Sequence, residues 1–199
     1  MKTHIRSFAL SSVLLALLPL SALADFSIYS AKNGFADGWK SIAWSGPVAE
    51  EIPGVAKDTT ALRISLKPDS QAYAGVVLTA TPGSEVALTE KIRQSGSVKI
   101  TVKLGETAAG AVATAPQQLQ IGLSFLTKDG QTVHGKFATQ VSVSTTSATE
   151  GQVITVAVPA SLEGIKAPEL LASISALRFQ FIDVPFAGFS VLDCSLKTE

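Results

Sequence analysis

Apolar and polar residues alternate with a period of two along most of this chain. In the segment 98–104, for example, four apolar residues are separated by two lysines and a threonine. This is the pattern of a β-strand with one buried face and one exposed face. Similar patterns mark further expected strands at 61–66, 73–78, 119–125, 141–143, 153–158, 177–182 and 189–196. Many short strands of this kind predict an all-β protein built from packed antiparallel sheets.

Turn signals separate the expected strands. Pro-containing segments at 67–70 and 81–84 break the alternation, and Asp129-Gly130 predicts a hairpin turn. The segment 105–118, rich in Ala, Gly and Thr, is expected to be a flexible loop. Only 167–173 is expected to be helical, because Pro168 and Glu169 suit a first helical turn.

The first 24 residues differ from the rest. Lys2 and Arg6 precede an apolar run at 8–20 that is too short to span a bilayer. Ala22-Leu23-Ala24 then matches the small-x-small pattern of a signal-peptide cleavage site. We expect residues 1–24 to be a cleaved signal peptide, with an uncleaved N-terminal anchor as the alternative. Residues 25–199 are then one domain, exported to the periplasm or beyond the cell, that does not insert into a membrane.

The charge balance gives no support for a nucleic-acid-binding function, and the cysteine content excludes a fold held by disulfides. Only 16% of the residues are charged, and the chain without Lys2 and Arg6 has a net charge of about −2. This balance gives no electrostatic reason to expect a nucleic-acid partner. Cys194 is the only cysteine, so no intramolecular disulfide can form. Alternation places Leu192, Cys194 and Leu196 on one face, which we expect to be core.

Both ends of the mature chain carry motifs that point to a family. Near the start runs Asn33-Gly34-Phe35-Ala36-Asp37-Gly38-Trp39, and the closing strand runs Phe189-Ser190-Val191-Leu192-Asp193-Cys194-Ser195-Leu196. This layout resembles the galactose-binding-like β-sandwiches, the jelly-roll group that includes many carbohydrate-binding modules. The resemblance implies an antiparallel jelly-roll sandwich whose first and last strands are neighbours. It also implies a polysaccharide or other glycan as the ligand.

The resemblance further implies a structural calcium ion held by acidic residues near the two ends. Asp193 matches the second Asp of the closing pair, but Leu192 replaces the first. Ala36 stands where the opening motif usually has Glu, which leaves Asp37 one residue away. Calcium requires six to eight oxygen ligands. Because half of the expected carboxylates are missing, the sequence favours a degraded or absent calcium site, and it indicates no other cofactor.

Catalysis has little support. His134 is the only histidine in 25–199, which excludes a metal site with several histidines, and it follows the predicted hairpin turn as an expected exposed residue. Glu50 and Glu51 are adjacent, so on a strand their side chains would point to opposite faces. A glycosidase needs two carboxylates across one cleft, and no such motif occurs. We therefore expect no enzymatic activity.

Sugar-binding sites combine flat aromatic rings with a few polar groups, because sugars present apolar C–H faces ringed by hydroxyls. The aromatic candidates are Trp44, Tyr73 and Trp39, which lie in or beside predicted loops. Trp39 stands at a position where the resembled family often has a structural tryptophan, so a core role is the favoured alternative for it.

The polar candidates are Arg63, Gln120, Arg178 and Gln180. They lie on the non-core faces of three expected strands that could line one concave sheet. Arginine offers a planar head with several donors, and glutamine both donates and accepts hydrogen bonds. The alternative is that all four are ordinary solvent-facing residues of a sheet.

These patterns predict a secreted, non-catalytic carbohydrate-binding β-sandwich. The alternative is a structural or protein-interaction domain of the cell envelope without a sugar ligand, which the low charge suits equally well. The two hypotheses differ in whether Trp39, Trp44 and Tyr73 are exposed together beside a cleft or buried separately.

Overall fold

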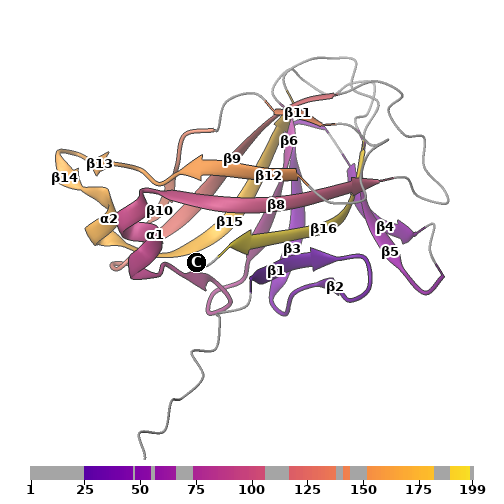
Figure 1. Cartoon of the computed structure of the whole chain (residues 1–199), viewed down its shortest axis with the longest axis horizontal. Helices are drawn as coiled ribbons and strands as arrows, with labels where there is room; N and C mark the ends of the chain where they lie inside the picture. The colour runs from indigo at the N-terminus through magenta and orange to yellow at the C-terminus, as the bar shows by residue number, and fades with distance from the viewer. Residues whose placement is uncertain are drawn as a thin grey trace, which may run out of the picture.

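The protein is a sandwich of two antiparallel β-sheets. The computed structural model describes residues 25–46, 48–54, 57–65, 74–105, 117–137, 141–143, 152–181 and 189–197. Within them, two sheets of seven strands each lie face to face (Figure 1). The expected signal peptide, the turn at 67–70, Tyr73 and most of the loop at 105–118 lie outside the described residues.

The first sheet is organised around the last strand of the chain. Its strands are β1 (Phe26–Ser30), β2 (Gly34–Phe35), β4 (Val48–Pro53), β5 (Thr60–Ser65), β8 (Ser97–Gly105), β12 (Gln152–Ala157) and β16 (Phe189–Lys197). They follow the order β12-β8-β16-β1-β2, with β5 also pairing with β16 and carrying β4. Because β16 pairs with β8, β1 and β5, it joins segments from the beginning, middle and end of the described chain.

The second sheet carries the residues of most interest for function. Its strands are β3 (Trp39–Trp44), β6 (Gly75–Ala80), β7 (Val86–Ala87), β9 (Gln117–Thr127), β10 (Thr132–His134), β11 (Val141–Val143) and β15 (Leu171–Phe181). The order is β10-β9-β15-β6-β3, with β11 on β9 and β7 on β15. In this order β3 is an edge strand.

Short elements gather at one end of the sandwich (Figure 1). They are α1 (Glu90–Ser95), α2 (Ala167–Leu170) and the hairpin of β13 (Ser161–Leu162) with β14 (Ile165–Lys166). In the described part of the chain, no helix combines the length and the apolar character that crossing a bilayer requires.

The core lies between the two sheets and is built by the alternation seen in the sequence. Its completely buried side chains include Ile28, Leu62, Ile64, Leu78, Ile100, Ile121, Leu123, Phe125, Leu177 and Phe179. Each such side chain stabilises the fold by roughly 1.5–3 kcal/mol relative to its exposed state. The described chain contains no disulfide, so this packing holds the sheets together.

Most of the strand predictions are confirmed. The alternating segments at 98–104 and 119–125 lie in β8 and β9, and the Asp129-Gly130 hairpin joins β9 to β10. Of the expected strand at 177–182, residues 177–181 lie in β15 and Ile182 lies outside the described residues. The expected contact between the first and last strands is also confirmed, since Phe26 pairs with Leu196 and Ser30 with Asp193.

The helix predictions were less accurate. The helix expected at 167–173 ends at Leu170, and the residues that follow begin β15. Helix α1 was missed, although its sequence carries capping signals. Thr89 Oγ1 accepts a hydrogen bond from Ile92 N at 3.2 Å, and Gly96 ends the helix with a left-handed φ of 67°. A helix of six residues is too short to show the apolar periodicity by which helices are recognised in a sequence, so the capping residues alone did not reveal it.

The face predicted for the closing strand needs one correction. A β-bulge between Val191 and Asp193 shifts the register of β16 against β8. Val191 is therefore buried and Leu192 is only partly buried, whereas Cys194 and Leu196 are buried as expected. A bulge adds one residue to one strand and so interrupts the period of two.

Cys194 should be inert in the folded protein. It is completely buried, and burial, with a smaller effect from the Asp193 charge, raises the pKa of its thiol far above the ordinary value. Since the thiolate is the reactive form, we expect a thiol reagent such as DTNB to label the protein only after unfolding in denaturant. Rapid labelling of the native protein would show that the last strand is not packed as described.

Candidate functional site: the outer face of the second sheet

The side of the second sheet that faces away from the first sheet, here called the outer face, brings several sequence-predicted residues into one row. Trp44 and Gln180 both pair with Gly75, and Gln180 also pairs with Gln120. Directly paired residues in antiparallel strands point to the same face. The row therefore runs from β3 through β6 and β15 to β9, a span of roughly 14 Å at the usual strand spacing.

Trp44 lies over the backbone of the neighbouring strand. A Cβ atom placed on Gly75 would stand only 2.2 Å from both Cη2 and Cζ2 of the Trp44 ring. The absence of a side chain at Gly75 is thus what lets the indole lie across β6. Trp44 itself is half-buried, so part of it faces solvent.

A second row lies next to the first along the strands and is more apolar. Ile42 pairs with Val77, Val77 with Arg178, and Arg178 with Gly122. Ile42 is 50% exposed, which is unusual for an isoleucine. Together with Trp44, it forms an exposed apolar strip on the edge strand β3.

Arg178 crosses β9 at Gly122 in this second row. Its Nη2 donates hydrogen bonds to the carbonyl oxygens of Leu123, at 3.1 Å, and of Gly135. Its Cζ lies 4.5 Å from the centroid of the Phe137 ring, within the range of a cation–π interaction. A Cβ on Gly122 would stand 3.0 Å from Arg178 Nη2 and 2.9 Å from Phe137 Cδ1. Gly122 therefore provides the space in which the guanidinium and the ring meet.

The electrostatic setting of Arg178 is unusual. Partial burial lowers the pKa of its guanidinium, although the group stays charged. Within the described part of the chain, its buried Nε has no hydrogen-bond partner and no carboxylate forms an ion pair with the guanidinium.

His134 lies in β10 at the far side of the same face. Its Nδ1 and Ser124 Oγ are 2.8 Å apart. Burial, followed by the nearby Arg178 charge, lowers the pKa of His134. The imidazole is therefore neutral at pH 7 and offers hydrogen bonds but no charge. As expected from the sequence, His134 is an exposed hairpin residue.

Two of the candidate binding residues do not reach this face. Trp39 is only 5% exposed; its Nε1 donates to the Ser84 carbonyl at 2.9 Å and its ring packs against Phe26. It is a core residue, as the favoured alternative held, so its place among the binding candidates was wrong. Arg63 belongs to β5 in the first sheet, where it pairs with Ser190 and Glu50. The expectation that it shares a sheet with the other polar candidates was also wrong.

Trp44, Gln120, Arg178 and Gln180 are the predicted residues that come together, and Tyr73 lies outside the described residues. Sequence reasoning missed Ile42 and Phe137. Ile42 and Trp44 are two residues apart, as side chains on one face of a strand are, but Ala43 between them is also apolar and no clear alternation marks β3. Phe137 follows β10 in an irregular segment and carries no comparable signal.

The calcium prediction gains no support from the side chains that are described. Asp37 is exposed in the turn between β2 and β3, while Asp193 is half-buried in β16, where it pairs with Ser30 and Lys103. Across the described segments, no group of three or more His, Cys, Asp or Glu side chains comes together. These donors do not fit an ion that requires six to eight oxygens, and calcium stays a prediction.

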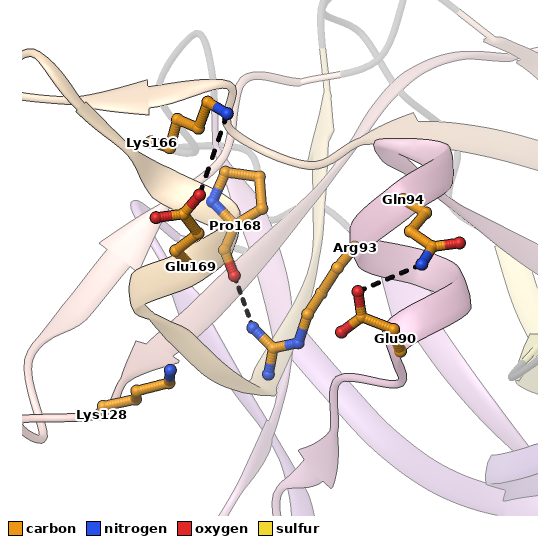
Figure 2. A pocket seen from close by; sticks show the side chains of 7 residues that line it. All are labelled: Glu90, Arg93, Gln94, Lys128, Lys166, Pro168 and Glu169. Carbon is orange, nitrogen blue, oxygen red and sulfur yellow. Dashed lines mark hydrogen bonds and ion pairs between the residues drawn. The ribbon is translucent and has the colours of Figure 1, made fainter.

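A polar pocket of about 490 Å³ opens between α1 and α2 (Figure 2). Its lining residues are Glu90, Arg93, Gln94, Lys128, Lys166, Pro168 and Glu169. Most of its polar groups pair with one another or with the backbone. Arg93 Nη1 donates to the carbonyls of Pro168 and Leu171, and Lys166 Nζ lies 3.9 Å from Glu169 Oε1. These contacts tie α1 to the segment that leads into β15, so the pocket has a structural explanation.

Comparison with protein-family models and with curated protein sequences finds no match. Solved structures are similar in fold. The solution structure of the carbohydrate-binding module CtCBM11 has a TM-score of 0.51 and 14% identity, over 89% of this chain and 96% of that one. The family 11 module from Clostridium thermocellum in complex with a β-1,3-1,4-mixed-linked tetrasaccharide has a TM-score of 0.49 and 13% identity, over 87% and 96%.

A further similar structure is the CBM22-1 xylan-binding domain of Paenibacillus barcinonensis Xyn10C. Its TM-score is 0.44 and its identity 14%, over 87% of this chain and 91% of that one. At such identities the likeness shows the fold alone. The likeness to CtCBM11 confirms the expected antiparallel jelly-roll β-sandwich of the kind found in carbohydrate-binding modules.

Replacing Gly75 should disturb both the fold and the position of Trp44. In Gly75→Ala the new Cβ would collide with the Phe179 carbonyl oxygen and the Trp44 ring, each at 2.2 Å. We expect a loss of about 1–3 kcal/mol in unfolding free energy, measured by urea denaturation, and a shift in Trp emission. Gly130→Ala is the control, because its Cβ meets nothing within 4 Å and its cost reflects the φ of 85° alone. Unchanged emission in Gly75→Ala would contradict the placement of Trp44.

Proposed function

We propose that this chain is an exported, non-catalytic carbohydrate-binding domain and that the outer face of the second sheet holds the sugar. One observation carries the proposal. The Trp44 indole lies over Gly75, in line with the amide side chains of Gln180 and Gln120. This row combines a flat apolar surface with neutral donors and acceptors, which is the combination that sugar recognition requires.

Each part of the row matches a part of a sugar ring. The apolar C–H face of a pyranose packs on the indole, and Ile42 and Val77 extend this apolar surface along the strands. A glutamine amide donates and accepts, so Gln180 and Gln120 suit hydroxyls in either role. The side chains are half-buried on a rigid sheet, which reduces the conformational entropy that binding costs.

The composition of the sheet supports a non-catalytic role. No strand of the second sheet contains Asp or Glu. Glycoside hydrolysis ordinarily uses two carboxylates across the bond that is cleaved, and the strands under the proposed ligand supply neither. His134 pairs with Ser124 and stands in a hairpin, with no described acidic residue beside it.

Export is supported by the basic and apolar residues of 1–24. The jelly-roll fold supports a binding role because it is shared with a carbohydrate-binding module. The residues that would contact a ligand are inferred from this chain alone.

A protein-interaction role is the second candidate, and exposed apolar residues favour it. Val153 on β12 is 59% exposed and Ile165 on β14 is 55% exposed, and neither belongs to the outer face of the second sheet. A protein partner seated on these residues would bind independently of Trp44. The same Trp44 variant therefore separates the two candidate functions.

Trp44→Ala should remove most of the sugar binding and leave the fold intact. Loss of an aromatic anchor typically costs about 2 kcal/mol of binding free energy, or roughly 30-fold in Kd. We expect stability to fall by no more than about 1 kcal/mol, because Trp44 is half-buried on an edge strand. Affinity electrophoresis against neutral and acidic polysaccharides measures the first effect, and thermal unfolding measures the second.

Trp39→Phe is the matched control for this experiment. It removes the other tryptophan, which lies in the core and donates to the Ser84 carbonyl. We expect it to lower stability while retaining sugar binding. If the wild-type protein binds no polysaccharide of the panel, or if Trp44→Ala binds as well as wild type, the proposed site is wrong.

A further inference from the structure

The two sheets differ in the signs of the charges that their strands carry. Strands of the first sheet carry both signs, since Glu50, Glu51 and Asp193 are accompanied by Arg63, Lys99, Lys103 and Lys197. Strands of the second sheet contain no Asp or Glu and include Lys40 and Arg178. Both cations alternate with the core-facing residues of their strands and so belong to the outer face. The strands beneath the proposed sugar site therefore supply positive charge only.

Arg178 is held in place without a counter-ion among the described residues. Nη2 is fixed by the Leu123 and Gly135 carbonyls, and the guanidinium stacks on Phe137. The side-chain hydrogen bonds that Arg178 makes to described residues come from Nη2. In the same part of the chain Nε is buried without a partner, and no ion pair involves the guanidinium. A partly desolvated cation without a nearby anion is unfavourable, and its fixed head can accept an anion with little loss of side-chain entropy.

Lys40 supplies a second cation on the same face. It is exposed and pairs with Thr79, from which the row continues through Ala176 and Ser124 to His134. The side chains of Thr79, Ala176 and Ser124 are small, so this row forms a low floor beside Arg178. From strand spacing and rise, the Cα atoms of Lys40 and Arg178 lie roughly 12 Å apart. Two charges at that separation can engage different units of one extended ligand.

We propose that the ligand of the outer face is an acidic polysaccharide that bears carboxylate groups. Arg178 Nη1 and Lys40 pair with carboxylates on the chain, while Trp44 packs against a ring and Gln180 and Gln120 bind hydroxyls. A neutral glycan could pack on Trp44 and bind Gln180 and Gln120, but it would offer no negative charge to Arg178. This inference rests on the proposed function and adds to it the chemical class of the sugar.

The test compares polysaccharides that differ only in charge. Polygalacturonate and polymannuronate are each paired with their carboxyl-reduced forms, which keep the chain length and lose the acid. Isothermal titration calorimetry of the wild-type protein at low salt should show binding to at least one acidic polymer. Its reduced form should bind at least about tenfold more weakly, and added NaCl should weaken the binding of the acidic form alone.

Three variants locate the charge effect. Lys40→Gln should weaken binding of the acidic polymer about threefold, as for an exposed ion pair, and Arg178→Gln about tenfold or more. Each substitution should weaken binding of the acidic polymer by a larger factor than any residual binding of the reduced polymer. Lys99→Gln is the matched control, since Lys99 is an exposed lysine of β8 in the first sheet and should bind like wild type. If Arg178→Gln fails to fold, Lys40→Gln and the polymer pairs still decide the question.

The outcomes separate the two proposals. Equal binding of acidic and reduced polymers, or binding of neutral glycans alone, would overturn the acidic ligand and leave the sugar-binding function standing. A loss of binding in Lys99→Gln equal to that in Lys40→Gln would also overturn it, because the charge effect would then not belong to this face. Failure to bind any polymer, acidic or neutral, would overturn both.

Discussion

The burial of alternate residues on each strand of the second sheet is the constraint on which the outer face depends. Leu177 and Phe179 are completely buried, and they stand on either side of Arg178 in β15. Successive side chains of a strand point to opposite faces of the sheet. Packing of these two side chains in the core therefore directs Arg178 and Gln180 to the outer face. The polar surface is thus held in position by apolar contacts on the opposite side of the same strands.

The closing strand extends this constraint to the whole sandwich. By pairing with β1, β5 and β8, β16 completes the first sheet, against which the buried face of the second sheet packs. The bulge at Val191 and Asp193 allows one strand to meet these different partners without losing its core residues. The outer face therefore depends on strand pairing between segments that are far apart in the sequence.

Much of the fold and part of the site could be predicted from the sequence, because alternation reports which face a residue occupies. It placed Gln120, Arg178 and Gln180 on non-core faces, and the structure joins them in one sheet. Alternation does not report which sheet a strand joins, so Arg63 was assigned to the wrong one. The period of two, applied to β3, would have put Trp39 and Trp44 on opposite faces, but the strand was not recognised between its two turns. No local pattern could reveal that Phe137 meets Arg178, since that contact depends on a glycine in another strand.

Gly75 and Gly122 lie on the two strands that flank β15, and each has the side chain of a neighbouring strand lying across it. The shape of the outer face therefore depends on two glycines that need not contact a ligand. Substitution at either glycine would lift Trp44 or the Arg178–Phe137 pair while leaving every recognition group chemically intact. During evolution, substitutions at Gly75 or Gly122 could thus change the shape of the outer face while the residues that contact the ligand stay the same.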